Sequence, residues 1–180
     1  DAEVLARVRL AHAMLLTLRG VPTIYAGDEQ GFAGDGWDQD AREDMFPSRV
    51  ASYNDNRLVG TTATTAESNF DTRHPLYRLI SELAALRTSH PALQRGRQIV
   101  RNYATTPGLF AVSRIDPGTG REVVIVFNTS TQPLKANVEV STHSARFETL
   151  YGQCPATAAA PGSVAIALPP LDFMICAGKE

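Results

Sequence analysis

The chain has 180 residues, of which 43% are hydrophobic and 20% are charged, and its formal net charge is −2. This length is sufficient for one or two domains with a hydrophobic core. Lysine and arginine residues are scattered rather than clustered, which argues against a nucleic-acid-binding protein. No apolar run reaches the roughly 18 residues of a membrane-spanning helix, so no membrane partner is expected. Cellular location stays open, because the targeting segment of a longer chain would lie upstream of these residues.

Residues 1–19 have the periodicity of an amphipathic helix. The expected apolar stripe consists of Val4, Val8, Ala11, Leu15 and Leu18, widened by Leu5 and Leu16. Asp1 is placed to cap the N-terminus, and Gly20 follows the last turn, where a left-handed residue is common. We therefore predict a helix that ends at Gly20.

The stretch after this helix is the most informative part of the sequence. Val21–Ala26 is short, apolar and rich in strand formers, which predicts a parallel strand buried on both faces. The adjacent carboxylates Asp28 and Glu29 follow its carboxyl end, where parallel α/β folds place ligands. They are candidate substrate-binding residues, although such acids also serve to cap a turn or pair with an arginine.

Three segments of the sequence resemble the α-amylase family of glycoside hydrolases (family 13). They are Gly20-Val-Pro-Thr-Ile-Tyr-Ala-Gly-Asp-Glu29, Asp40-Ala-Arg-Glu-Asp-Met-Phe46, and the run from Pro75 to Leu93. The resemblance implies that residues 1–94 are the C-terminal piece of a (β/α)8 TIM barrel, containing its last strand and last two helices. It also implies that residues 95–180 form the family's domain C. One departure from the family pattern is Ala26, where a second tyrosine is commoner.

Residues 31–73 lack a regular period, which in a compact domain is typical of a functional loop. Trp37, Asp40 and Arg42 lie in its acidic first half, between Asp35 and Asp44. An aromatic face with planar charged groups is a frequent way to bind sugars, so these three residues are candidate substrate-binding residues. The alternative is that Arg42 forms ion pairs with Asp38, Asp40 or Asp28 and only holds the loop against the barrel rim. A calcium site is not expected here, because the acids do not follow the twelve-residue calcium-loop pattern; calcium in a longer parent chain stays open.

The second half of this loop, residues 60–69, is poor in apolar residues, and we expect it to be mobile or variable. A helix is predicted to follow from Pro75 to Arg87, with one apolar stripe formed by Leu76, Leu79, Ile80, Leu83 and Leu86. His90-Pro91 should end it, since the residue before a proline avoids the helical region.

From Arg97 onward the apolar period becomes two and turn residues recur, which predicts a β-domain that closes its own core. Six strands are expected after a first segment beginning at Arg97: residues 108–115 and 121–128 as a hairpin, then 134–140, 146–151, 164–168 and 172–177. Residues 123–127 are continuously apolar, as in a strand covered on both sides. We expect an antiparallel β-sandwich with Greek-key connections. Its aromatic residues are attributed to core packing: Tyr103, Phe110, Phe127, Phe147 and Tyr151.

Cys154 and Cys176 are the two cysteines of the chain, one in a predicted turn and one in the last strand. Two cysteines cannot form a four-ligand zinc site by themselves, and they are too far apart for a Cys-x-x-Cys motif. A disulfide is geometrically conceivable, but free buried thiols are the favoured interpretation.

The family resemblance implies a parent enzyme that cleaves or transfers α-glucosidic bonds with retention, without a cofactor. Its three catalytic carboxylates follow strands that would lie upstream of Asp1, so we assign no catalytic residue to this chain. The fragment is expected to be inactive and to self-associate through its exposed strand. Within the parent enzyme it is expected to contact the N-terminal barrel, which is missing here, and to take part in binding an α-glucan or maltooligosaccharide. Two alternatives stay open, an independent carbohydrate-binding module and a structural module. Linkage preference, and hydrolysis versus transfer, are not determined by these residues.

Overall fold

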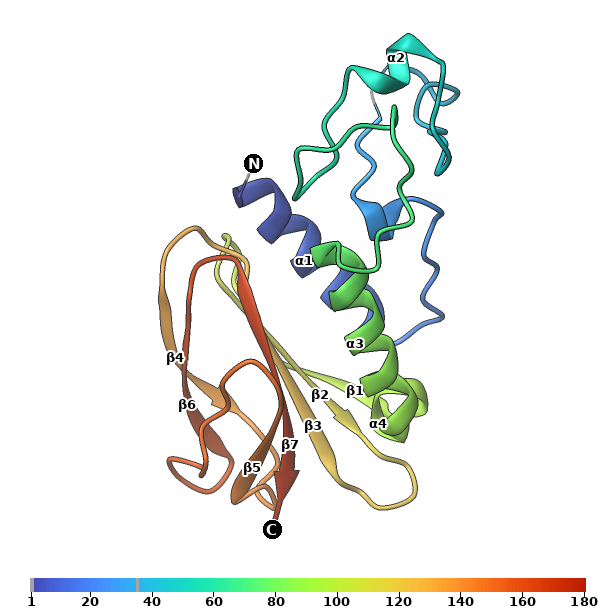
Figure 1. The fold of residues 1–180 in the computed structure, drawn as a ribbon. Coiled ribbons are helices and arrows are strands. Elements are labelled where there is room, and N and C mark those ends of the chain that lie inside the picture. Colours follow the sequence, from blue (N-terminus) through green and yellow to red (C-terminus); the bar gives the residue numbers. More distant parts are fainter. Residues whose placement is uncertain (1, 35) are drawn as a thin grey trace. The chain divides into compact units, whose positions relative to one another are not determined.

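The computed structural model describes residues 2–34 and 36–180 (Figure 1). Its contacts divide the chain into two compact units. We call the first, the residues up to Arg9 together with Pro22–Glu82, the loop unit. The second, Leu10–Val21 together with Leu83–Glu180, is the sheet unit. Within the described residues, no helix is long and apolar enough to cross a membrane.

The two predicted helices are confirmed, with small changes at their ends, as α1 (Ala2–Thr17) and α3 (Pro75–Ser89). The short α4 (Pro91–Arg95) was not predicted and begins where the sequence predicted an end. Pro91 is the first residue of α4, a position at which proline is well tolerated. The proposed cap at Asp1 lies outside the described residues. Two further short elements were also not predicted: the 3-10 turn η1 (Asp28–Gln30) and α2 (Ala51–Asn54).

Most of the expected apolar stripe of α1 is not buried. Val4 and Leu15 are exposed, whereas the buried apolar residues are Leu10, Ala13 and Leu16, of which Leu16 alone was expected on the stripe. The helix carries apolar residues on more than one side, so its periodicity alone does not choose the buried face. That choice is made by the contacts of residues 10–17 within the sheet unit.

The predicted strand at Val21–Ala26 is also wrong for this chain. The segment forms no strand, and the side chain of Val21 is 91% exposed. A strand requires a hydrogen-bonded neighbour, and none of the strands in the described residues pairs with this segment. The barrel strand that the resemblance implies is therefore not formed here.

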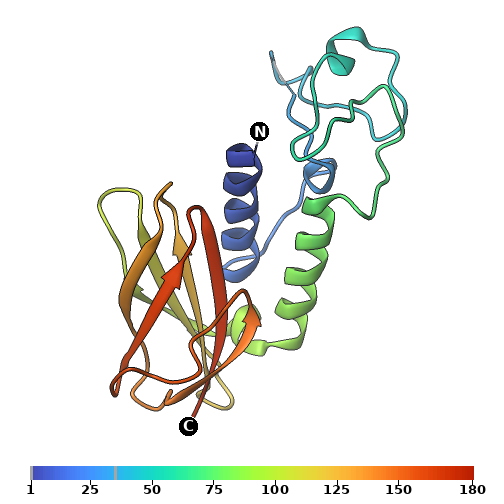
Figure 2. The same cartoon turned by 60° about the vertical axis from the view of Figure 1, so that its left-hand side comes forward.

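The sheet unit contains the predicted antiparallel β-structure (Figure 2). Its strands are β1 (Arg97–Asn102), β2 (Leu109–Ile115), β3 (Glu122–Asn128), β4 (Leu134–Glu139), β5 (Arg146–Tyr151), β6 (Ser163–Leu168) and β7 (Asp172–Lys179). Five form one sheet in the order β1-β2-β3-β7-β5, and β4 pairs with β6 in a second sheet. The apolar core contains side chains from both sheets, among them Val126 of β3, Ile166 of β6 and Met174 of β7. The Greek-key description of the connections stays a prediction.

The hairpin of β2 and β3 turns at Asp116, as expected. The Asp116 carboxylate accepts hydrogen bonds from the main-chain N–H groups of Gly118 and Thr119, at 2.7 and 2.9 Å. All seven residues of β3 are buried, which confirms that both of its faces are covered. Val124 and Val126 belong to the core between the sheets, and α4 contacts β2 and β3.

The aromatic residues of the sheet unit are mostly core residues, with one exception. Phe127 and Phe173 are buried, and the ring of Tyr151 stacks on that of Phe173 with centroids 4.5 Å apart. Phe110 stacks on Phe127 from the neighbouring strand, at 5.8 Å. Tyr103, in contrast, is 77% exposed, so core packing does not explain it.

The favoured interpretation of the cysteines as free thiols is wrong, because Cys154 and Cys176 form a disulfide with a Cα–Cα distance of 5.8 Å. Thr149 of β5 pairs directly with Cys176 of β7. Gly152, whose φ is 73°, then turns the chain back towards β7. This turn brings Cys154 beside Cys176 at a separation usual for disulfides.

Candidate functional site

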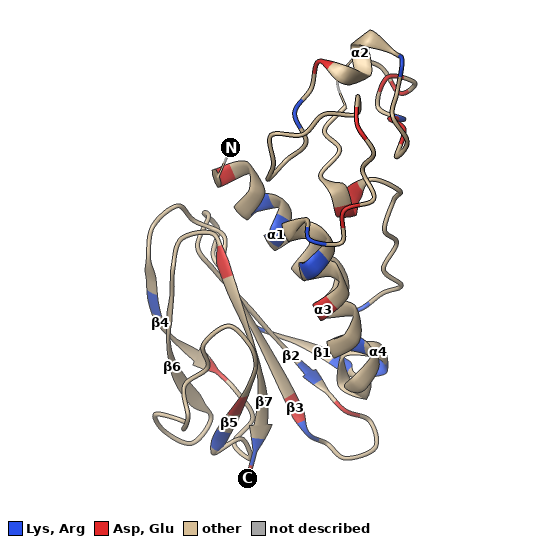
Figure 3. Ribbon diagram, in the orientation of Figure 1, with Lys and Arg blue, Asp and Glu red and all other residues tan. Residues whose placement is uncertain are grey.

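The acidic turn after residue 26 depends on two glycines in the left-handed region. Gly27 has a φ of 103° and Gly31 a φ of 71°, one on each side of η1. Glycine adopts such angles without the steric cost of a Cβ atom. The turn presents Asp28 and Glu29 on one short element, shown in red in Figure 3.

Both carboxylates of this turn accept main-chain hydrogen bonds within it. Asp28 Oδ2 accepts from the Tyr25 N–H at 2.9 Å, and Glu29 Oε2 accepts from the Gly27 N–H at 3.1 Å. Both carboxylates therefore cap their own turn. Turn capping was the alternative to substrate binding that the sequence left open for these residues. Both residues are half-buried.

Three contacts attach the turn to distant parts of the loop unit. The side-chain amide of Gln30 donates to the carbonyl of Asp71 at 3.2 Å and accepts from the Asp71 N–H at 3.3 Å. The Val59 N–H donates to the Gly31 carbonyl at 2.7 Å. Residues 27–31 are thereby fixed against residues 59 and 71.

His74 is a buried residue that the sequence analysis did not identify. It is 2% exposed, and its Nδ1 accepts a hydrogen bond from the Leu76 N–H at 3.2 Å, at the first turn of α3. Burial lowers the pKa of His74, while Asp71 and the main chain near Val59 oppose that shift more weakly. The imidazole therefore acts as a neutral cap of the helix. The His-Pro sequence before the helical pattern was the available indication, because it marks the N-terminal boundary.

Trp37, Asp40 and Arg42 lie on a separate turn of the loop unit. Trp37 is 85% exposed, and Arg42 forms an exposed ion pair with Asp38. That pair was one of the alternatives considered for Arg42. Asp40 is half-buried, and its N–H donates to the Trp37 carbonyl at 2.9 Å. Asp35, the first residue of this acidic segment, lies outside the described residues.

Residues 60–69, which were expected to be mobile, form a hydrogen-bonded loop. Thr65 and Asn69 are buried. Thr65 Oγ1 donates to Asn54 Oδ1 at 2.8 Å, and Asn69 Nδ2 donates to the carbonyls of Thr64 and Glu67. Polar side chains rather than apolar ones thus give this loop its conformation.

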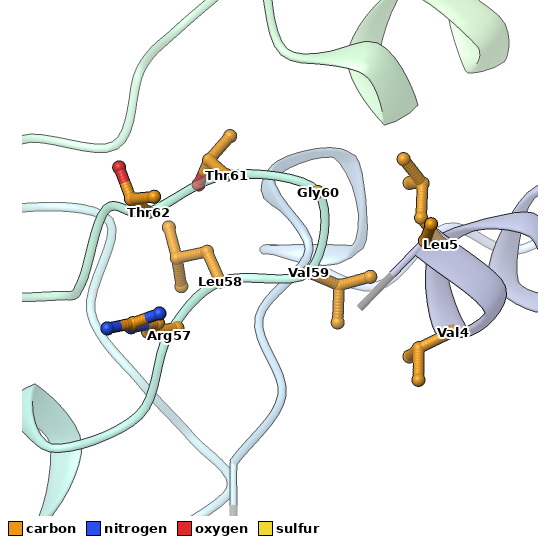
Figure 4. Close-up of a pocket in the computed structure, with 9 residues that line it drawn as sticks. Val4, Leu5, Arg57, Leu58, Val59, Gly60, Thr61 and Thr62 are labelled. Atoms are coloured by element: carbon orange, nitrogen blue, oxygen red, sulfur yellow. The ribbon is translucent and has the colours of Figure 1, made fainter.

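Two pockets lie on either side of the loop 57–62. The apolar pocket, of about 390 Å³, is formed by Val4 and Leu5 opposite residues 57–62 (Figure 4). Arg57 is the one ionisable side chain among its lining residues, so it offers no acid–base pair. The polar pocket, of about 320 Å³, lies at the N-terminus of α3 and includes Gln30, Phe70 and Asp71.

The chain is similar to known amylolytic enzymes. It is 47% identical over 152 residues, 84% of its length, to an α-amylase of Streptomyces lividans. Its fold matches a debranching enzyme from Nostoc punctiforme with a TM-score of 0.68 and 28% identity over 97% of the chain. It also matches an Anoxybacillus α-amylase in fold, with a TM-score of 0.70 at 21% identity over 97% of the chain.

The chain spans only part of each of these proteins: 16% of the Streptomyces enzyme, 31% of the Nostoc enzyme and 33% of the Anoxybacillus enzyme. No family model matches it.

Proposed function

Because the chain is homologous to the α-amylase family of glycoside hydrolases, we propose that it forms the C-terminal part of a retaining glycosidase that acts on α-glucans. The observation that carries this proposal is the 47% identity to an α-amylase over 84% of the chain. The matching fold of the Nostoc debranching enzyme supports it.

We further propose that these 180 residues do not catalyse the reaction by themselves. Retention requires two carboxyl groups about 5 Å apart on opposite sides of the scissile bond. Asp28 and Glu29 are adjacent in the chain and bonded to their own turn. The fully buried Glu122 is engaged by Arg101 at 2.8 Å and by Ser144 at 2.7 Å.

Substrate binding is assigned to Asp28, Glu29, Trp37, Asp40 and Arg42. The exposed indole of Trp37 offers an apolar face for a sugar ring. The half-buried Asp40 and the guanidinium of Arg42 offer an acceptor and donors for hydroxyl groups. Because the Arg42–Asp38 pair is exposed, it contributes little to stability, so the pair can open to admit a ligand at low cost.

Two measurements test the proposal. The purified 180-residue chain should show only background turnover of starch or an activated maltoside; turnover that Glu29→Gln abolishes would prove it wrong. In the longer enzyme, Arg42→Ala should raise KM or lower kcat/KM by roughly ten- to a hundredfold, whereas Arg121→Ala, at an exposed turn of the sheet unit, should change neither. Unchanged kinetics for Arg42→Ala would remove this residue from the site.

A further inference from the structure

We propose that the polar pocket at the N-terminus of α3 binds one glucosyl unit of an α-glucan, as a site separate from Trp37, Asp40 and Arg42. Its volume of about 320 Å³ lies at the lower end of the range for small-molecule sites. The pocket is formed by residues of the loop unit alone. The choice of an α-glucan rests on the proposed function; the choice of a neutral sugar rests on the pocket itself.

Phe70 supplies an aromatic wall. Its side chain is 57% exposed although it is a large apolar residue. The ring of Phe46 contacts it edge-to-face, with centroids 5.0 Å apart, and so restricts its orientation. An exposed ring held in one orientation can stack on the C–H face of a sugar with little loss of side-chain entropy.

Asp71 and Arg73 supply oriented polar groups beside this ring. Asp71 Oδ1 accepts from the Arg73 main-chain N–H at 2.9 Å and from Arg73 Nε at 3.1 Å. These bonds hold the pKa of Asp71 below its usual value, so the carboxylate is ionised at neutral pH. Asp71 Oδ2 and the two terminal nitrogens of Arg73 then form an acceptor and donor set suited to neighbouring hydroxyl groups.

The position of Asp71 is fixed before any ligand arrives. Its main-chain N–H and carbonyl both bond to the Gln30 amide, and the His74 N–H donates to the Asp71 carbonyl at 3.1 Å. Preorganisation of this kind lowers the entropy that binding must overcome.

The charges of the pocket favour a neutral ligand. Its lining contains the carboxylates of Glu67 and Asp71 and the guanidinium of Arg73, and His74 is held neutral by burial. An anion such as phosphate would meet two carboxylates. Among the described residues, no three acidic, histidine or cysteine side chains are grouped to hold a metal ion. A ring with one apolar face and several hydroxyl groups satisfies both the aromatic wall and the polar set.

The test is a titration of the ¹⁵N-labelled 180-residue chain with maltotriose, followed by NMR. We expect saturable shifts of the amides of residues 61–74, with a dissociation constant in the low millimolar range. Phe70→Ala should weaken binding at least tenfold. Phe70→Leu retains an apolar contact for Phe46 but has no ring face, so it should weaken binding similarly while preserving the fold. Tyr103→Ala removes an even more exposed aromatic residue, in the sheet unit, and should leave binding unchanged.

The outcomes separate this inference from the proposed function. If Trp37→Ala abolishes binding and both Phe70 variants bind normally, the sugar occupies the other site; the inference is then wrong and the proposed function stands. Absence of shifts in residues 61–74 at saturating maltotriose also overturns the inference. The activity of the longer enzyme tests the proposed function independently of either result.

Discussion

Arg114 of β2 donates a hydrogen bond from Nη1 to the carbonyl oxygen of Thr17, the last residue of α1, at 2.7 Å. Its Nη2 donates to the Gly96 carbonyl at 3.1 Å. Arg87 acts on the same helix end, with Nη1 2.9 Å from the Leu16 carbonyl. Two guanidinium groups thus satisfy carbonyls that the end of a helix leaves unpaired, and their charge complements the negative end of its dipole.

Arg114→Met should therefore destabilise the sheet unit by about 2–3 kcal/mol, because it removes the donors that bond the carbonyls of the buried Thr17 and the half-buried Gly96. Methionine preserves most of the side-chain volume, which limits the contribution of a cavity. The free energy of unfolding in urea measures the effect. Arg97→Met, at an exposed position of β1, is the control and should lie within about 0.5 kcal/mol of the unsubstituted chain. Equal losses for the two variants would show that the helix-end contacts do not stabilise the unit.

A chain shortened to residues 97–180 should be less stable than the whole chain, contrary to the expectation that this segment closes its own core. The sheet unit also includes residues 10–21 and 83–96. Ile125 and Phe127 are fully buried but are not part of the core between the two sheets. Exposure of each such side chain costs about 1.5–3 kcal/mol. Urea unfolding compares the two chains, and an undiminished free energy of unfolding for residues 97–180 would contradict the prediction.

The loop unit should lose stability on mild acidification because of His74. The pKa of this residue is lower in the folded chain than in the unfolded one, mainly through burial. The unfolded state therefore takes up the proton first. The stability that neutral His74 gives the folded loop unit is complete above the unfolded pKa of about 6.5. It is lost as pH falls from there through the folded pKa. Protonation also removes the acceptor for the Leu76 N–H.

His74→Asn tests this pH dependence, because asparagine can cap the helix but does not titrate. Hydrogen exchange of the amides in residues 27–34 and 59–80 should rise between pH 7.5 and 5.5 in the unsubstituted chain, after correction for the intrinsic pH dependence of exchange. In the variant the rise should be smaller. An identical pH profile in both chains would assign the effect to other groups.

Gly31 and Gly120 separate two costs of adding a side chain. Both have a φ of 71°. A Cβ at Gly120 meets nothing within 4 Å, whereas one at Gly31 would collide with the main-chain oxygen of Val59. Gly120→Ala should cost about 1–2 kcal/mol from backbone strain alone, and Gly31→Ala should cost at least about 2 kcal/mol more because the turn must shift. Hydrogen exchange of the amides in each turn measures the two free-energy costs. Equal costs would mean that the turn carrying Asp28 and Glu29 can move away from the main chain of Val59 without loss of stability.

The sequence determined those features that depend on neighbours along the chain. The alternation of residues 134–139, the apolar run 123–127 and the turn at Asp116 specified strands and a hairpin that the structure contains. Pro75 and the stripe after it specified α3. These patterns record which face of an element is apolar and where the backbone must turn, so they can be read without knowledge of the fold. The family resemblance required only the same local segments.

The tertiary structure decided what depends on distant partners. Residues 21–26 have the composition of a buried strand, but no strand of the described residues provides the hydrogen bonds to make one. Cys154 and Cys176 form a disulfide because β5 lies beside β7, which their spacing in sequence does not reveal. The pocket beside Phe70 brings together Gln30 and Asp71, which are hydrogen-bonded although they lie 41 residues apart in the sequence. Local propensity is a property of a segment, whereas burial, pairing and a binding site are properties of the contacts between segments.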